Sequence, residues 1–293
     1  MNPARRLTWL VVLIAVLASL AAAAPFVITT GAGPSLHTSV RGEEVLLYGR
    51  GPYRDMPADV AVQGLAQDLI TMVVGVPWLL VCLGWARRGA RAGYLALCGA
   101  LAYLFVQYFL YLGMATYNEL FLLWVALVLC TFQALARLLL ALPAGSFSAG
   151  RDCPRSRRYV GGFLVVNGAL VGLLWVSVVV RPWLAGRLYP EGLAHLTTLV
   201  VQGYDLALFL PPSLWAGCSY WRRRAAGELL APVYSVFLVL QMAALLAKIA
   251  WMSAVGVSAG PALVVIPLLL VGSGVAAVLA LRPHRGALLP ALP

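Results

Sequence analysis

Apolar runs long enough to cross a lipid bilayer recur along this chain, and they limit its fold more than any other feature. A helix needs about 20 apolar residues to span the hydrocarbon layer. Eight such runs can be read, at residues 7–28, 67–85, 92–112, 120–142, 160–180, 196–218, 230–252 and 261–281. Because backbone polar groups inside a bilayer must be satisfied within the protein, such runs form helices. The sequence therefore predicts an all-α integral membrane bundle of eight transmembrane helices, forming a single domain over residues 1–293.

The composition supports a membrane environment and argues against a nucleic-acid partner. The chain is 62% hydrophobic and 11% charged, whereas a soluble domain carries about 25% charged residues. Its net charge of +11 would suggest nucleic-acid binding in a soluble protein. Here, however, the arginines lie in short loops between apolar runs, and no basic helix or aromatic RNA-binding motif accompanies them. We therefore predict no nucleic-acid partner.

The arginines fix the expected orientation. With the N-terminus inside, fourteen fall in inner segments: Arg5, Arg6, Arg87, Arg88, Arg91, Arg151, Arg155, Arg157, Arg158, Arg222, Arg223, Arg224, Arg282 and Arg285. Five fall in outer segments: Arg41, Arg50, Arg54, Arg181 and Arg187. Basic loops remain on the cytoplasmic side. We therefore expect a multi-pass protein of the bacterial inner membrane with both termini cytoplasmic, whose arginine clusters contact anionic lipid headgroups.

The first apolar run has a second interpretation. Arg5 and Arg6, the run itself and the alanine tract at 21–24 also fit a cleavable signal peptide. Cleavage would leave seven spans and an external N-terminus. The run continues through Phe26 and Val27, which is long for a signal core, so we favour a retained span.

Two connecting segments are long. The outer loop at 29–66 follows the first span, and residues 44–48 and Tyr53 flank a Gly-Arg-Gly-Pro turn at 49–52. This pattern predicts a short hairpin, a candidate lid over the outer mouth of the bundle, and the alternative is a plain surface connector. Asp59, after Pro57, is expected to cap a helix that runs on into the second span. The inner loop at 143–159 is rich in Gly, Ser and Arg and is expected to be flexible.

Polar residues inside the apolar runs are the best pointers to function. Lys248, the single lysine among twenty arginines, lies within a predicted span, and Asp205 is the carboxylate deepest inside one. A lone ammonium in a span costs about 2.5–3.5 kcal/mol, so Lys248 should have a partner, with Asp205 the nearest candidate. The two are offset by about 7 Å along the membrane normal, so direct contact is not assured. Pro211 and Pro212 should kink the sixth span just below Asp205.

The outer half of the bundle collects most of these polar side chains. Our candidate binding site comprises Asp68, Gln107, Tyr111, Asn118, Glu119, Gln202, Asp205 and Lys248. Such groups avoid acyl chains, so we expect them to enclose a wet cavity bounded by spans two, three, six and seven. The inner half, with Gln133, Arg137 and Asn167, should be drier. For each residue the alternative is structural, as helix-bridging amides or interfacial aromatic groups.

Four segments resemble a family of uncharacterised bacterial polytopic membrane proteins. They are 117–127 (YNELFLLWVAL), 205–216, 221–224 and the span that carries Lys248. The resemblance extends from about residue 45 to 281. It implies an eight-span bacterial membrane protein, but no activity and no site residues.

Three kinds of function remain open at this point. Binding or transport of a small solute is our first hypothesis, because a carboxylate and an amine suit a zwitterion, an anion or proton exchange. The second is a non-catalytic sensor or assembly subunit with a partner membrane protein. An enzyme is third, because no zinc-protease, serine-hydrolase or paired-aspartate motif is found. A retinal protein with Lys248 as Schiff base is disfavoured because the lysine is too near the surface. We expect no cofactor and no metal.

Overall fold

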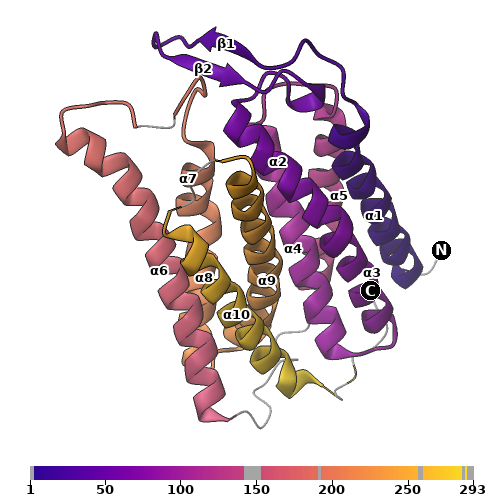
Figure 1. Ribbon diagram of the computed structural model, residues 1–293. Helices are drawn as coiled ribbons and strands as arrows, with labels where there is room; N and C mark the ends of the chain where they lie inside the picture. The colour runs from indigo at the N-terminus through magenta and orange to yellow at the C-terminus, as the bar shows by residue number, and fades with distance from the viewer. Residues whose placement is uncertain (1–2, 142–152, 191–192, 257–259, 286–287, 289–293) are drawn as a thin grey trace.

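The chain folds into a helical bundle capped at one end by a two-stranded hairpin (Figure 1). This computed structural model describes residues 3–141, 153–190, 193–256, 260–285 and 288. The end of the bundle that carries the hairpin is called the hairpin end below. Helix α1 (Pro3–Val27) begins at the opposite end, and α10 (Ala262–Leu281) finishes there.

Seven helices of the described residues are long and apolar enough to cross a membrane. They are α1, the column α2–η2–α3 (Ala58–Ile70, Thr71–Gly75, Val76–Arg87), α4 (Arg91–Met114), α5 (Phe121–Leu140), α6 (Pro154–Leu184), α9 (Ala225–Ala254) and α10. The protein is therefore a multi-pass membrane protein with an all-helical bundle.

The expected span at 196–218 takes a different form. It is a column of three shorter pieces, α7 (Val200–Tyr204), the π-helical turn η3 (Asp205–Phe209) and α8 (Leu210–Trp221). Gln202, Asp205 and the proline pair make this column more polar than the seven long helices. The count of eight spans thus stays a prediction.

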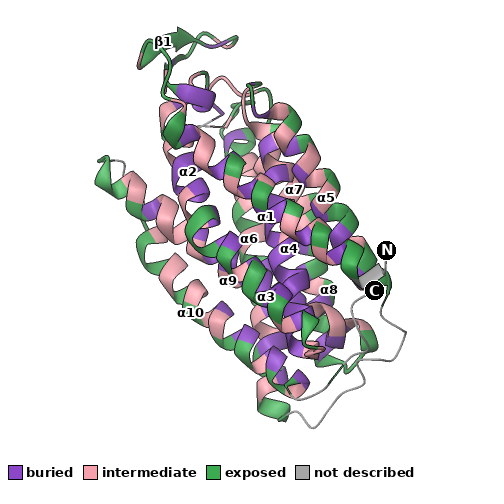
Figure 2. Cartoon of the chain, turned by 90° about the vertical axis from the view of Figure 1, so that its right-hand side faces the viewer, coloured by how far each residue is buried: buried purple, intermediate pink, exposed green. Residues whose placement is uncertain are grey.

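Helix α4 occupies the centre of the bundle. It is the most buried of the seven long helices, and it packs against α3, α5 and α9 (Figure 2). Close contact with α9 is possible because Gly99 has no side chain, and an added Cβ would lie 2.6 Å from the Val236 Cβ. Helices α6 and α10 instead expose long rows of Leu and Val, as expected of surfaces that face lipid.

The loop after α1 contains a hairpin, but not between the strands that the sequence suggested. Strand β2 (Glu44–Leu47) pairs antiparallel with β1 (Ser35–Thr38), which precedes it. The expected turn at 49–52 leads into the 3-10 helix η1 (Gly51–Tyr53) and folds back, since Gly49 N–H donates to the Arg54 carbonyl at 2.8 Å. The strand signal was correct for one strand; the partner lacked the alternating pattern that would have marked it.

Two helices begin before their apolar runs. The helix of the second span begins at Ala58, before the apolar run at residue 67, as the expected helix running on into this span implies; Pro57 is at the N-cap position and Asp59 in the first turn. Asp59 makes no capping hydrogen bond, so its expected role was wrong. Helix α6 begins at Pro154, so residues 154–159 are helical and do not belong to the flexible loop predicted at 143–159. Most of that loop, 143–152, lies outside the described residues.

Candidate functional site

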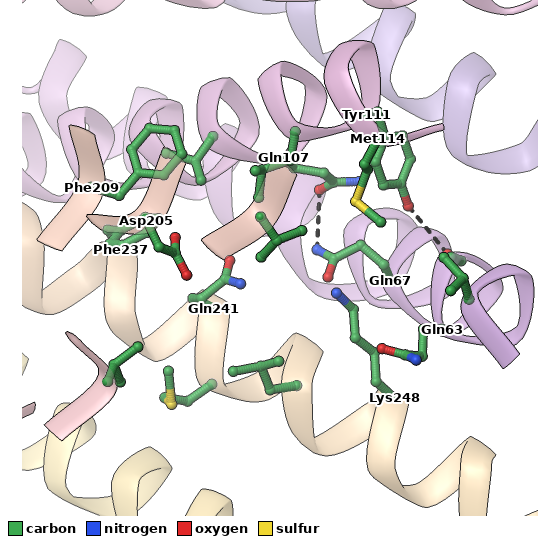
Figure 3. Close-up of a pocket in the computed structure, with 18 of the residues that line it drawn as sticks. Gln63, Gln67, Gln107, Tyr111, Met114, Asp205, Phe209, Phe237, Gln241 and Lys248 are labelled. Carbon is green, nitrogen blue, oxygen red and sulfur yellow. Dashed lines mark hydrogen bonds between the residues drawn. The ribbon is translucent and has the colours of Figure 1, made fainter. Parts of the chain in front are cut away.

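A cavity of about 250 Å³ lies in the half of the bundle nearer the hairpin end. Its walls come from α2, α4, α6, the α7–η3–α8 column and α9, and from Tyr53 and Met56 of the loop that follows the hairpin. On α6 the lining residues recur every four positions, at Asn167, Val171 and Trp175. The lining polar side chains are Tyr53, Gln63, Gln67, Gln107, Tyr111, Asn167, Trp175, Asp205, Tyr234, Gln241 and Lys248 (Figure 3).

Asp68 lies one layer behind the cavity wall. Its carboxyl group accepts hydrogen bonds from Tyr53 Oη at 2.5 Å and from Tyr111 Oη at 3.2 Å. Tyr111 also packs edge-on against Tyr53 and Trp124. Asp68 is only 1% exposed. It therefore holds the tyrosines that face the cavity, and it does not line the cavity itself.

Two glutamine amides form the polar wall next to these tyrosines. Gln67 Nε2 donates to Tyr103 Oη at 2.8 Å and to Gln107 Oε1 at 3.3 Å. Thr71 Oγ1 donates to the same Gln107 oxygen at 2.7 Å. This network leaves Gln67 Oε1 and Gln107 Nε2 buried without a partner among the described residues. Unpaired buried polar atoms are costly, so these two atoms are available to water or to a ligand.

Asp205 stands on the other side of the cavity. Its carboxylate accepts a hydrogen bond from Trp175 Nε1 at 2.7 Å. It opens the π-helical turn η3, and a second such turn, η2, follows Asp68 within the second span. Four residues further on, Tyr234 Oη donates to the Phe209 carbonyl at 2.6 Å. π-helical turns inside α-helices are frequent at functional sites.

Lys248 reaches the cavity from α9. The described residues give its ammonium no ion pair and no hydrogen bond, although Asp68 and Asp205 are both close enough to attract it. In Figure 3 the side chain points toward Gln63 and Gln67, and Gln241 lies between it and Asp205. Direct contact between Asp205 and Lys248, which the sequence left open, is therefore not made.

The structure gathers only part of the predicted site. Gln107, Tyr111, Asp205 and Lys248 line the cavity. Gln202 is half-buried but does not line it. Asn118 is buried, and its Oδ1 accepts a hydrogen bond from Leu120 N–H at 2.9 Å in the turn before α5.

Glu119 lies outside the membrane-spanning helices and pairs with Arg54 at 2.7 Å. Its own backbone N–H and the Arg54 guanidinium lower the pKa of this carboxyl group below its usual value. The pair connects the outer loop to the start of α5 and lies apart from the cavity.

Several functional candidates were missed in the sequence. Gln63, Gln67 and Gln241 were not among the predicted site residues, although the spacing of four puts Gln63 and Gln67 on one face of α2. Asn167 was assigned to the drier inner half, yet it lines the cavity, as the three glutamines do. At the opposite end a buried pair, Arg157 with Glu228 at 2.6 Å, was not expected at all.

No group of three or more His, Cys, Asp or Glu lies together within the described ranges, so they offer no evident metal centre. Comparison of the chain with protein-family models, curated proteins and solved structures finds no match. The function is therefore argued from the geometry of the cavity.

Proposed function

We propose that this protein binds a small polar solute in the cavity between α2, α4, α6, η3 and α9, as a step in sensing or transporting it. The observation that carries the proposal is the convergence of unpaired polar groups on one space. Gln67 Oε1, Gln107 Nε2 and Asn167 Oδ1 are buried without partners, and Lys248 has no ion pair within the described part of the chain. A packed structural core satisfies such atoms.

The proposal includes a topology of eight spans, with the α7–η3–α8 column as the sixth. Those of the inner-side arginines that the structure describes lie at the end opposite the hairpin, which favours both termini in the cytoplasm of a bacterial cell. The cavity would face the outside. Anionic lipid headgroups would contact the exposed arginines at the inner end.

The hairpin supports a role as a lid. Arg41, in the turn between β1 and β2, donates to the carbonyls of Ala194 and Leu196 in the loop before α7. His37 on β1 lies edge-on against His195 in the same loop, with ring centroids 5.7 Å apart. Tyr53 and Met56, in the segment that follows the hairpin, line the cavity. Movement of the hairpin with this segment would therefore change access to the cavity.

A ligand screen on the purified full-length protein in mild detergent tests the proposal. Midpoints of thermal unfolding are measured with amino acids, ω-amino acids, dicarboxylates, amines, sugars and inorganic ions, one class at a time. Because a ligand that binds only the folded state stabilises it, at least one class should raise the midpoint. Lys248→Met and Asp205→Asn should abolish that rise. Arg50→Met and Glu119→Gln, which remove the same kinds of charge outside the cavity, should preserve it.

Uptake of the stabilising solute into proteoliposomes then separates a transporter from a binding protein. The proposal is wrong if no class stabilises the protein and Gln63→Cys, in a cysteine-free background, does not react with a small water-soluble thiol reagent. That result would describe a dry, closed core. Another chain retained during mild purification would then favour the assembly-subunit alternative.

A further inference from the structure

The two charged groups of the cavity lie on opposite sides of it. Lys248 brings an ammonium group, a hydrogen-bond donor, and Asp205 brings a carboxylate, an acceptor. The unpaired atoms Gln67 Oε1, Gln107 Nε2 and Asn167 Oδ1 add uncharged acceptors and a donor to the walls. Figure 3 shows Lys248 and Asp205 at opposite sides of the space, with Gln241 between them. The cavity thus has a donor pole and an acceptor pole.

The two poles are separated by more than a hydrogen bond can bridge. Tyr234 on α9 bonds to the Phe209 carbonyl, which fixes the relative height of α9 and the antiparallel column. Asp205 lies four residues from Phe209, on the side of the hairpin end. This places Asp205 near the level of Leu238 on α9, and Leu238 is ten residues before Lys248. At 1.5 Å per residue, the Cα atoms of Asp205 and Lys248 are about 15 Å apart along the helix axis. The Lys248 side chain inclines toward the start of α9, which reduces the distance between the two charged groups to roughly 10 Å.

The middle of the cavity is mainly apolar. Val106 and Leu110 of α4 face it, as do Leu238 and Met242 of α9. A cavity of about 150 Å³ accommodates a six-carbon ring. The present volume of about 250 Å³ therefore suits a solute of roughly seven to ten non-hydrogen atoms. Gln241 carries both a donor and an acceptor, so it suits either end of such a solute.

We infer that the ligand is a short linear zwitterion of the ω-amino acid class, with its carboxylate at Lys248 and its ammonium at Asp205. The inference rests on the proposed solute-binding function. After one hydrogen-bond length at each end, about 4–5 Å remains between the ligand's charged groups. Two or three methylenes span this distance, whereas an α-amino acid, whose amine and carboxylate are bonded to the same carbon, reaches only one pole at a time.

A chain-length series tests the inference on the purified full-length protein. Dissociation constants are measured by equilibrium dialysis for glycine, β-alanine, 4-aminobutanoate, 5-aminopentanoate and 6-aminohexanoate. Butanoate and butylamine serve as single-charge controls. Binding should be tightest for β-alanine or 4-aminobutanoate. It should weaken about 10- to 100-fold when either ligand charge is removed, as expected for loss of a charged hydrogen bond.

Variants assign each pole. Lys248→Met should reduce the affinity for 4-aminobutanoate to that for butylamine, and Asp205→Asn should reduce it to that for butanoate. Arg50→Met and Glu119→Gln should bind like the wild type. Dialysis measures binding directly, so a lower stability of a variant does not obscure the result; gel filtration confirms that each variant is folded.

The outcomes separate the two levels of the proposal. If butanoate or butylamine binds as tightly as the zwitterions, the zwitterion assignment is wrong and solute binding stands. The assignment is also wrong if affinity is independent of chain length, or if another class from the screen binds through Lys248 while the ω-amino acids do not. If nothing in the series or in the screen binds, both proposals fail together.

Discussion

Asp68 illustrates how a carboxyl group is accommodated inside an apolar bundle. Both of its oxygens accept hydrogen bonds from tyrosine hydroxyls, and one of these tyrosines, Tyr53, belongs to the loop after the hairpin. A buried acceptor without partners would cost much more than the bonds contribute. The arrangement therefore ties the loop to the second span and gives Asp68 a structural role at the edge of the cavity.

Removing the Tyr53 hydroxyl should destabilise the protein. Tyr53→Phe takes one of two partners from a buried carboxyl group, which typically costs about 1.5–3 kcal/mol. We expect the midpoint of thermal unfolding in detergent to fall by roughly 3–10 °C. Tyr117→Phe removes the same hydroxyl from a residue that is 78% exposed and should leave the midpoint unchanged. Equal effects of the two substitutions would show that the Asp68 contact contributes nothing.

The Arg157–Glu228 pair is the strongest polar contact at the opposite end. Both side chains are 4% exposed, and the Arg157 guanidinium also donates to the Tyr220 carbonyl at 2.6 Å and covers the Tyr220 ring. The pair thereby connects the start of α6, the end of α8 and the start of α9. It closes the bundle beneath the cavity.

Breaking this pair should cost more than replacing it. Arg157→Met or Glu228→Met alone leaves a buried charge without its partner, at about 3–5 kcal/mol. The double substitution should recover a large part of that loss, and a double-mutant cycle on thermal unfolding measures the coupling. Arg158→Met, at an exposed neighbouring position, is the control. Strictly additive single effects would contradict the coupling.

At the scale of elements, glycines set the distance between helices. Gly99→Ala places a Cβ 2.6 Å from the Val236 Cβ and 2.7 Å from the Val233 carbonyl, so α4 and α9 must separate. We expect a loss of about 1–3 kcal/mol in unfolding free energy. Gly84→Ala on α3 meets no atom within 4 Å and should be neutral or slightly stabilising. Similar losses for both would indicate a helix-wide effect and no specific contact.

The elements also show what a sequence can reveal here. Hydropathy predicted the ends of α4, α5 and α10 closely, because a helix that faces lipid needs a continuous run of apolar residues. Hydropathy did not mark the first part of the second span, from Ala58, because it packs inside the protein and carries Gln63 and Gln67; the Pro57–Asp59 pattern indicated this start instead. The two π-helical turns are invisible to periodicity, because they shift the register only locally.

At the scale of the whole molecule, the sequence indicated which polar residues avoid lipid, but not which ones meet. Lys248 and Asp205 stood out as charges inside apolar runs, and both line one cavity. Glu119 carried an equal signal and instead pairs with Arg54 at the surface. A residue near a helix end has two directions available, toward the bundle or toward water. Only the packing of neighbouring helices decides between them.

The topology of the whole chain can be tested with a native reporter. Cys153 is exposed just before α6, and the backbone N–H groups of Arg155 and Ser156 lower the pKa of its thiol, which increases its reactivity. In our topology it lies in the cytoplasm. With the other four cysteines replaced, an impermeant maleimide should label Cys153 in inverted vesicles and not in intact cells.

Ser35→Cys and Ala194→Cys, at the hairpin end, should show the opposite pattern in a background without Cys153. Substituted Ser156 and Ala226 should behave like Cys153, because they lie at the same end of the bundle. If the chain crosses the membrane eight times, cysteines in the loop before α7 and in the loop after α8 must be labelled from opposite sides of the membrane. If Ala194→Cys and Ala226→Cys label from the same side, the polar α7–η3–α8 column does not cross the membrane. The cavity would then lose the wall that carries Asp205, and its proposed ligand with it.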